Sequence, residues 1–228
     1  MSFKVKVAIV DNAVDHHLYT PVEHWAAHLA VPWEAFRARD GRLPSPGDGF
    51  SHVILTGSEA SILDREPWVY RVVSFIQEAA EKGLAILGSC YGHQLLALSL
   101  NGPASVRRCP QPEIGWIPVD VLETSDFLGE SGTAYSFSLH FDEVVDTRGQ
   151  YKILASTAVC PVQAMSCVGR RAWGLQIHPE IDIPTGQRFL RDSIGLNART
   201  TPLYEAALKT EPRDSGLIHR IVKYFLNS

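Results

Sequence analysis

The sequence predicts an α/β fold, with a single three-layer domain over residues 1–228, a central and mostly parallel sheet, and a small antiparallel excursion. In the first hundred residues, short β-branched or apolar runs alternate with helical patterns, and this alternation is typical of βαβ units. Several of these runs are continuously apolar. Such runs are expected for strands that helices cover on both faces.

The first half of the chain is expected to begin with a strand and to alternate from there. A helix at 20–30 starts with Thr20 and Pro21, an N-cap residue followed by proline at the first helical position. A second helix at 66–83 carries an apolar stripe and ends at Gly83, a suitable residue for a helix C-terminus. The other expected elements are strands at 4–11, 52–57 and 84–89 and a third helix at 91–102.

The second half has shorter strand-like runs separated by Pro, Gly and Asp. This punctuation between about 103 and 170 predicts the antiparallel excursion, attached to the same sheet. The Pro/Gly-rich stretch at 41–49 reads as a surface connection and not as a linker between domains. Strands are expected at 117–122, 151–157, 162–168 and 172–178, and an amphipathic closing helix at 215–228.

Composition narrows the class of function. The formal net charge is -4, which gives a nucleic-acid partner no electrostatic support. No apolar run is long enough to span a bilayer, and the N-terminus lacks the pattern of a signal peptide, so a cytoplasmic protein is expected. The four cysteines should then be reduced. They form neither a C-x-x-C pair nor a zinc-ligand spacing, so no metal and no cofactor are expected.

The stretch GSCYGHQ, residues 88–94, has the features of a nucleophile elbow. An apolar run precedes it, a helical pattern follows it, and small residues flank Cys90 at two positions on either side. Gly88 and Gly92 allow the strand and the helix to pass close together. Cys90 would lie at a helix N-terminus, which favours the thiolate, and the Tyr91 N–H would form half of an oxyanion hole. The alternative is a buried cysteine in a glycine-rich turn.

A nucleophilic cysteine needs a base, and two of the nine histidines are candidates. His178 ends a strand-like run, and Glu180 stands two residues later, where an extended chain places it on the same side. His140 has Asp142 in the same relation, but no glycine elbow or strong strand pattern precedes it. We therefore assign His178 as the base and His140 as a residue that lines the site.

Together these motifs resemble the class I (triad) glutamine amidotransferase domain, over nearly the whole chain. GSCYGHQ fits the family pattern G-x-C-x-G-x-Q, and LQIHPE fits Q-x-H-P-E. The segments EIGW (113–116) and SLHFDEV (138–144) resemble the branch related to the amidotransferase domain of GMP synthase. The resemblance implies a flavodoxin-like amidotransferase fold.

The resemblance also implies a role for each matching residue. Cys90 would attack the γ-carboxamide of glutamine, His178 would act as base and then protonate the departing ammonia, and Glu180 would orient His178. A γ-glutamyl thioester would form on Cys90 and be hydrolysed to glutamate.

The same resemblance assigns the residues that hold the substrate. Gln94, Ser138 and His140 are expected to contact it, and the loop around Gly57 would supply the second oxyanion N–H. Here the sequence departs from the family, because Thr56-Gly57-Ser58-Glu59 replaces a Gly-Gly-Pro-x loop. The geometry of this loop, and with it the identity of the substrate, is therefore open.

Three functions remain open from the sequence. The chain carries neither a P-loop nor the S-G-G-x-D-S motif of an ATP-pyrophosphatase domain, so it is not expected to activate an acceptor by itself. The first expectation is a glutaminase that delivers ammonia to a separate synthetase. The alternatives are a stand-alone hydrolase of other γ-glutamyl amides or peptides, and a non-catalytic binding module on the same fold.

Overall fold

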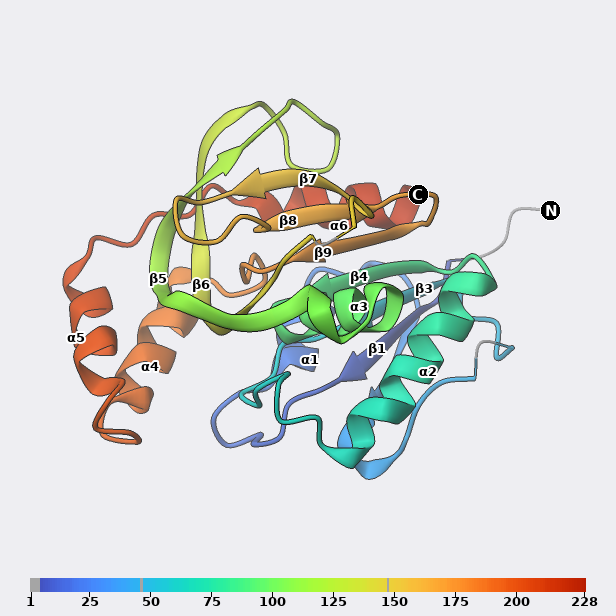
Figure 1. Cartoon of the computed structure of the whole chain (residues 1–228), viewed down its shortest axis with the longest axis horizontal. Coiled ribbons are helices and arrows are strands. Elements are labelled where there is room, and N and C mark those ends of the chain that lie inside the picture. The colour runs from blue at the N-terminus through green and yellow to red at the C-terminus, as the bar shows by residue number, and fades with distance from the viewer. Residues whose placement is uncertain (1–4, 46, 147) are drawn as a thin grey trace.

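A nine-stranded sheet forms the centre of the molecule, in the order β2-β1-β3-β4-β9-β8-β7-β5-β6 (Figure 1). The computed structural model describes residues 5–45, 47–146 and 148–228. The strands are β1 Val7–Asp11, β2 Trp33–Arg37, β3 His52–Leu55, β4 Ala85–Ser89, β5 Val106–Val121, β6 Gly132–Val144, β7 Tyr151–Ser156, β8 Ala164–Cys167 and β9 Ala172–Leu175. The helices are α1 Pro21–Ala26, α2 Pro67–Glu81, α3 Tyr91–Asn101, α4 Ile183–Ser193, α5 Thr201–Lys209 and α6 Leu217–Asn227, with short 3₁₀ turns at Ala38–Asp40 and Pro103–Ser105.

The sheet has a parallel half and an antiparallel half. Strands β2, β1, β3, β4 and β9 pair in parallel, and β9, β8, β7, β5 and β6 pair antiparallel. The parallel pairing of β4 with β9 sets Ser89 beside Leu175. The C-terminal ends of these two strands therefore lie next to each other at one edge of the sheet, where open α/β sheets place their sites.

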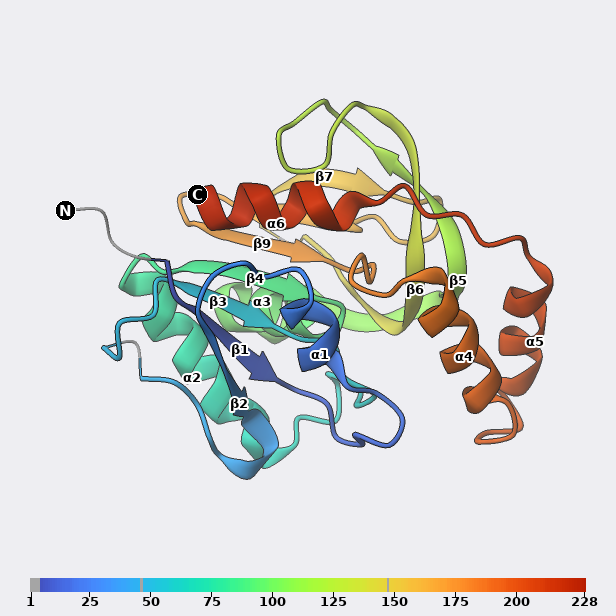
Figure 2. The ribbon, with the colours of Figure 1, turned by 180° about the vertical axis from the view of Figure 1, so that it is seen from behind.

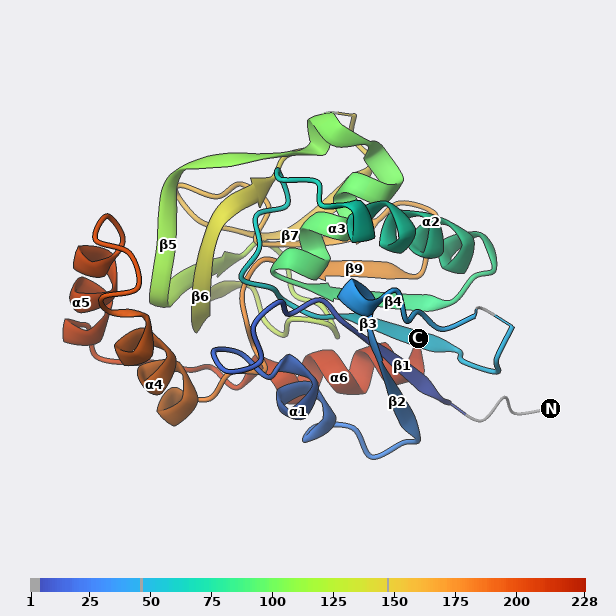
Figure 3. The same ribbon diagram turned by 90° about the horizontal axis from the view of Figure 1, so that it is seen from below.

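Helices cover both faces of the parallel half. Helices α2 and α3 lie on one face and α1 and α6 on the other, as Figures 2 and 3 show. Successive residues of a strand point to opposite faces, so Ile54 packs in the core beside α1 and α6, whereas Val53 and Leu55 pack in the core beside α2 and α3. This burial on both sides explains the continuously apolar strands.

Most of the expected elements are present within a few residues of their predicted bounds. Residue 4, where the first strand was expected to begin, lies outside the described residues, and β1 begins at Val7. Helix α1 ends at Ala26, earlier than the expected 30. Gly83 follows α2 with φ 74°, the left-handed conformation that the sequence assigned to this helix end.

The antiparallel part is larger than expected. The run at 117–122 belongs to a strand of 16 residues, β5, which pairs with the 13-residue β6. Pro110 and Pro112 lie where the β5–β6 register shifts, between Arg108 and Glu113, so proline interrupts the pattern without ending the strand. The sequence did not predict β2, α4 or α5 either. Helices α4 and α5 pack beside the bent β5–β6 pair.

Two further observations bear on the expected class of protein. Within the described residues, no helix combines the length and the apolar character that crossing a bilayer requires. Cys90, Cys109, Cys160 and Cys167 are buried free thiols.

The turn between β4 and α3 depends on two glycines. A Cβ atom on Gly92 would lie 2.1 Å from the Leu55 carbonyl oxygen, and one on Gly88 would lie 2.4 Å from the Gly92 carbonyl oxygen. Both contacts are with backbone, which cannot move aside as a side-chain end can. The start of α3 is therefore pressed against β3 and β4 more closely than any residue with a side chain would allow.

We expect Gly92→Ala to destabilise the protein by about 1–3 kcal/mol or more, because the added methyl overlaps the β3 backbone. Urea unfolding monitored by tryptophan fluorescence measures this change. Gly47→Ala is the matched control, since its Cβ would lie 3.8 Å from the nearest neighbouring atom, Ser45 Oγ, in ordinary contact. Equal stability of the two variants would contradict the close packing of this turn.

Candidate functional site

Cys90 occupies a strained backbone position between β4 and α3. It has φ 47° and ψ −105°, a conformation that residues with a side chain rarely adopt. The strand ends at Ser89 and the helix begins at Tyr91, so the sharp turn falls on the cysteine itself. This geometry is the nucleophile elbow that the sequence predicts, and it leaves the Tyr91 N–H in the first helical turn, where N–H groups lack intrahelical partners.

The neighbouring strand brings His178 to the same edge. The Cys90 N–H donates to the Leu175 carbonyl over 2.7 Å, which ties the elbow to the end of β9. Three residues beyond β9, the His178 N–H donates to the Phe137 carbonyl of β6 over 2.8 Å. Cys90 and His178 both line one cavity of about 560 Å³. The structure thus places them together although 88 positions separate them in the sequence.

Glu180 accepts hydrogen bonds from three side chains. Its Oε1 lies 2.8 Å from His178 Nδ1, the Tyr19 hydroxyl donates to Oε1 over 3.0 Å, and Ser89 Oγ lies 3.2 Å from both carboxylate oxygens. Burial raises the pKa of Glu180, but the charge of His178 and the hydrogen bonds outweigh it, so the pKa is lowered. The carboxylate therefore stays ionised in a fully enclosed position and holds the proton on His178 Nδ1.

His178 is held in its charged form by its neighbours. Burial alone lowers its pKa, but the charges of Cys90 and Glu180 outweigh this effect and raise the pKa to about 10. An imidazolium between a sulfur and a carboxylate is an acid that can protonate a leaving group. The position and charge of His178 and Glu180 fit a Cys-His-Glu triad, and the catalytic role of the three residues stays a prediction.

Gly57 lies against the triad. A Cβ atom there would lie 2.8 Å from His178 Cε1 and 3.1 Å from the Tyr19 hydroxyl, so only glycine fits. The loop is held by Asn12, whose Nδ2 donates to the Thr56 carbonyl over 2.9 Å. Gly57 thus lies next to His178 and Tyr19, and Ser58, the following residue, lines the cavity. The oxyanion role of Gly57 and Tyr91 stays a prediction.

Two glutamines connect Cys90 to the opposite wall of the cavity. Gln94 Nε2 donates to the Asp142 carbonyl over 2.7 Å and to Gln176 Oε1 over 3.3 Å. Gln176 Nε2 in turn lies 3.7 Å from Cys90 Sγ. The sequence singled out Gln94 but gave Gln176 no role, although Gln176 is the glutamine of the Q-x-H-P-E motif. Tyr19 was also missed, because it lies in an irregular loop with no motif around it.

The other two expected substrate contacts lie differently. Ser138 is completely buried and does not appear among the described residues that line the cavity. His140 lines the cavity, but its ring nitrogens already have protein partners, the Asp142 carbonyl and Glu113, each at 3.0 Å. Any contact of His140 with a substrate would therefore use its backbone or ring carbons.

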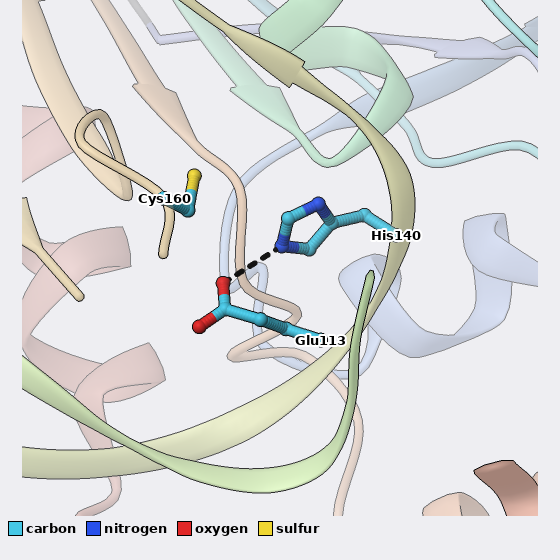
Figure 4. A group of neighbouring side chains, drawn as sticks. All are labelled: Glu113, His140 and Cys160. Atoms are coloured by element: carbon cyan, nitrogen blue, oxygen red, sulfur yellow. Dashed lines mark hydrogen bonds and ion pairs between the residues drawn. The ribbon is translucent and has the colours of Figure 1, made fainter. Parts of the chain in front are cut away.

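One group among the described residues has the donor atoms of a metal site. Glu113, His140 and Cys160 place one ligand atom each within 4.8 Å of one another (Figure 4). However, Glu113 also accepts hydrogen bonds from Thr157 and Gln163, and burial raises the pKa of the Cys160 thiol well above its ordinary value, which disfavours the thiolate that metals bind. The group fits a buried hydrogen-bonded ion pair better than a metal site.

Helices α4 and α5 and the connection between them line part of the cavity. Phe189 of α4 and Tyr204 of α5 line it, together with Leu196, Asn197 and Arg199 of the connection between them. These residues add apolar surface and one cation on the side away from α3.

Comparisons with known proteins agree with this geometry. The family model described as "Glutamine amidotransferase class-I" matches residues 9–195. The chain is 37% identical over 130 residues to a glutamine-hydrolysing GMP synthase of Aeropyrum pernix, covering 57% of this chain and 24% of that protein. It is 33% identical over 133 residues to one subunit of a glutamine-hydrolysing GMP synthase of Saccharolobus solfataricus, covering 58% of this chain and 68% of that subunit. The match thus spans about a quarter of the Aeropyrum protein and two thirds of the Saccharolobus one.

Solved structures show the same fold. A glutamine amidotransferase of Thermotoga maritima superposes with a TM-score of 0.72 at 21% identity, covering 99% of both chains. One of Methylobacillus flagellatus gives 0.70 at 20% identity, covering 98% of this chain and 90% of that one. That residues 196–228 belong to the same domain stays a prediction. The fold, the converging motifs and the family match together show that this chain is a member of the class I glutamine amidotransferase family.

Proposed function

We propose that this protein hydrolyses glutamine through a thioester on Cys90 and releases glutamate and ammonia for a separate synthetase. The observation that carries the proposal is the convergence of Cys90, on its strained turn, with His178 in one cavity, where Glu180 is hydrogen-bonded to His178. The relatives whose names contain GMP synthase support a synthetase as the partner that consumes ammonia.

The chemistry follows from the positions of these groups. The Cys90 thiolate attacks the γ-carbonyl carbon, and the Tyr91 N–H and the Gly57 loop stabilise the negative oxygen. The C–N bond then breaks, and the His178 imidazolium gives its proton to the departing ammonia. Water next attacks the thioester, passes a proton to His178, and releases glutamate and the Cys90 sulfur. Glu180 orients His178 in both halves of the reaction.

A second candidate is a stand-alone hydrolase of larger γ-glutamyl amides or peptides, and the size of the cavity favours it. Even at the volume that liquid water takes per oxygen atom, the roughly ten non-hydrogen atoms of glutamine would fill only about 300 Å³. The cavity measures about 560 Å³, and the apolar residues Phe189, Leu196 and Tyr204 line part of it. A leaving group larger than ammonia would occupy this space.

We expect Cys90→Ala to abolish release of ammonia from glutamine, because no other group can form the thioester. Ammonia release is measured in an assay coupled to glutamate dehydrogenase. In a second measurement, mass spectrometry of the trapped γ-glutamyl adduct should locate it on Cys90. Cys167→Ala, a buried thiol in the core below α3, is the matched control and should retain turnover. Turnover that survives in Cys90→Ala would contradict the assignment of the nucleophile.

A panel of donors distinguishes the two candidates. A glutaminase that serves a synthetase should turn over glutamine faster than γ-glutamyl amides or peptides with apolar leaving groups, and its rate should rise when the synthetase partner is added. A stand-alone hydrolase should show the reverse order of kcat/KM with no response to a partner. Absence of turnover with every donor, with and without the partner, would leave only a binding role.

The pH dependence should reflect His178. Because its pKa is raised to about 10, the imidazolium persists through neutral pH, and kcat/KM should fall as the pH rises through about 10. The same pairing stabilises the fold below the ordinary histidine pKa, and this contribution is lost as the pH rises through about 10.

Glu180→Gln tests the cause of this shift. It removes the charge that helps to raise the pKa of His178, so the alkaline fall should move to lower pH and kcat should drop. Tyr204→Phe, which changes the same cavity away from the triad, should leave the profile in place. An unchanged alkaline limb in Glu180→Gln would show that Glu180 does not set the charge of His178.

A further inference from the structure

A continuous chain of hydrogen bonds leads from a buried carboxylate to the sulfur of Cys90. It begins at Glu113 on β5, passes to His140 on β6, and continues to the main-chain carbonyl of Asp142. From there it runs through Gln94 on α3 to Gln176 after β9, whose amide nitrogen faces the sulfur. Each of these side chains is buried. The chain therefore connects β5, β6, α3 and the segment after β9 through protein groups alone.

The carbonyl of Asp142 fixes the direction of this chain. A carbonyl oxygen can only accept, so His140 Nδ1, at 3.0 Å, must carry a proton. His140 Nε2 faces Glu113 Oε2 at 3.0 Å, so these two groups share one further proton and the pair is neutral overall. A neutral pair suits an enclosed position, and Figure 4 shows the imidazole directed at the carboxylate.

The same carbonyl sets the orientation of both amides. Because Asp142 can only accept, the NH₂ end of Gln94 must face it, at 2.7 Å. The second N–H of that group then points at Gln176, whose Oε1 accepts it over 3.3 Å. This leaves the NH₂ end of Gln176 for Cys90 Sγ. An amide in either place turned by 180° would set donor against donor or acceptor against acceptor.

We propose that the buried Glu113–His140 pair holds the Asp142 carbonyl in place, and that this carbonyl, as the acceptor for Gln94, makes Gln176 present an N–H to the Cys90 sulfur. A hydrogen bond from an N–H to an anion is stronger than one to a neutral group, so the thiolate gains from it. The same orientation of Gln94 leaves its side-chain carbonyl oxygen as the group that a donor substrate meets. Glu113, His140 and Gln176 are thus positioning residues, and this inference rests on Cys90 being the nucleophile of the proposed function.

The structure explains why the pair sits so far from the sulfur. Glu113 and His140 lie directly opposite each other in the β5–β6 register, just beyond the irregular stretch of β5. Glu113 also accepts from Thr157 Oγ1 over 2.7 Å and from Gln163 Nε2, which ties it to the β7–β8 connection. Glu113, itself fixed by Thr157 and Gln163, therefore holds the ring of His140 in place. The strand segment that carries Asp142 is thereby fixed against the cavity.

Alkylation of Cys90 by iodoacetamide, measured on the acid side of its pH–rate profile where the thiolate population limits the rate, tests the proposal without any substrate. Gln176→Met removes the N–H, and we expect alkylation to become about tenfold slower, as for the loss of a hydrogen bond to a charged group. Glu113→Ala should slow it several-fold, whereas Glu113→Gln should stay close to wild type. In Glu113→Gln, the new side-chain amide can donate one hydrogen bond to His140 Nε2. It can donate a second to Oε1 of Gln163, which has no partner in the wild-type structure, once the Gln163 amide turns over. The direction of the hydrogen bonds in the chain is then preserved.

Melting temperatures and Gln150→Met, an exposed glutamine, control for effects on folding. If folded Gln176→Met and Glu113→Ala were alkylated at the wild-type rate, the proposal would be overturned, even with glutamine turnover still dependent on Cys90. If Glu113→Ala does not fold, the proposal is tested by the alkylation rate of Gln176→Met and by the ¹⁵N NMR spectrum of His140 in the wild-type protein. The proposal requires a protonated Nδ1, and an unprotonated Nδ1 would overturn it. Because iodoacetamide needs no γ-glutamyl donor, these outcomes do not depend on which substrate the enzyme uses.

Discussion

The parallel pairing of β4 with β9 is the constraint on which the site depends. Two strands far apart in the sequence end side by side because Ser89 lies opposite Leu175, and the Cys90 N–H completes the ladder by donating to the Leu175 carbonyl. A shift of one residue in this register would turn either Cys90 or His178 to the other side of the sheet. The glycines at 88 and 92 serve the same constraint, since they allow α3 to start directly above the strand ends.

Burial makes the charges of the site effective. In water, a thiolate, an imidazolium and a carboxylate would be screened from one another, but here the ring of His178 and the carboxylate of Glu180 are almost fully enclosed. Enclosure alone would neutralise them, and it is opposed by the donors around Glu180, above all His178 and Tyr19. In both residues the charge and hydrogen bonds of the neighbours outweigh the effect of burial, so the pKa of His178 is raised and the pKa of Glu180 is lowered.

The sequence indicates that Cys90, His178 and Glu180 come together, as they do in the structure, because the patterns around them are local. The glycines around the cysteine indicate a tight turn, and the spacing of two residues between the histidine and the glutamate puts both on one side of an extended chain. The β4 and β9 patterns place the cysteine and the histidine at strand ends. The long β5–β6 pair was missed because Pro110 and Pro112 resemble breaks, whereas the register shift accommodates them. The position of Ser138 depends on which face of a bent strand it occupies, and the roles of Tyr19 and Gln176 depend on contacts between distant segments, which no local pattern encodes.

The cavity is built from two parts of the chain with different duties. Cys90 lies between β4 and α3 and His178 lies just beyond β9, whereas α4, α5 and their connection line another part of the cavity. The family match ends at residue 195, so Leu196, Arg199 and Tyr204 lie beyond the shared pattern. The connection after α4 and helix α5 can therefore be lengthened, recharged or exchanged without disturbing the register that aligns Cys90 with His178. Selection of what enters the cavity and the chemistry performed inside it can evolve independently.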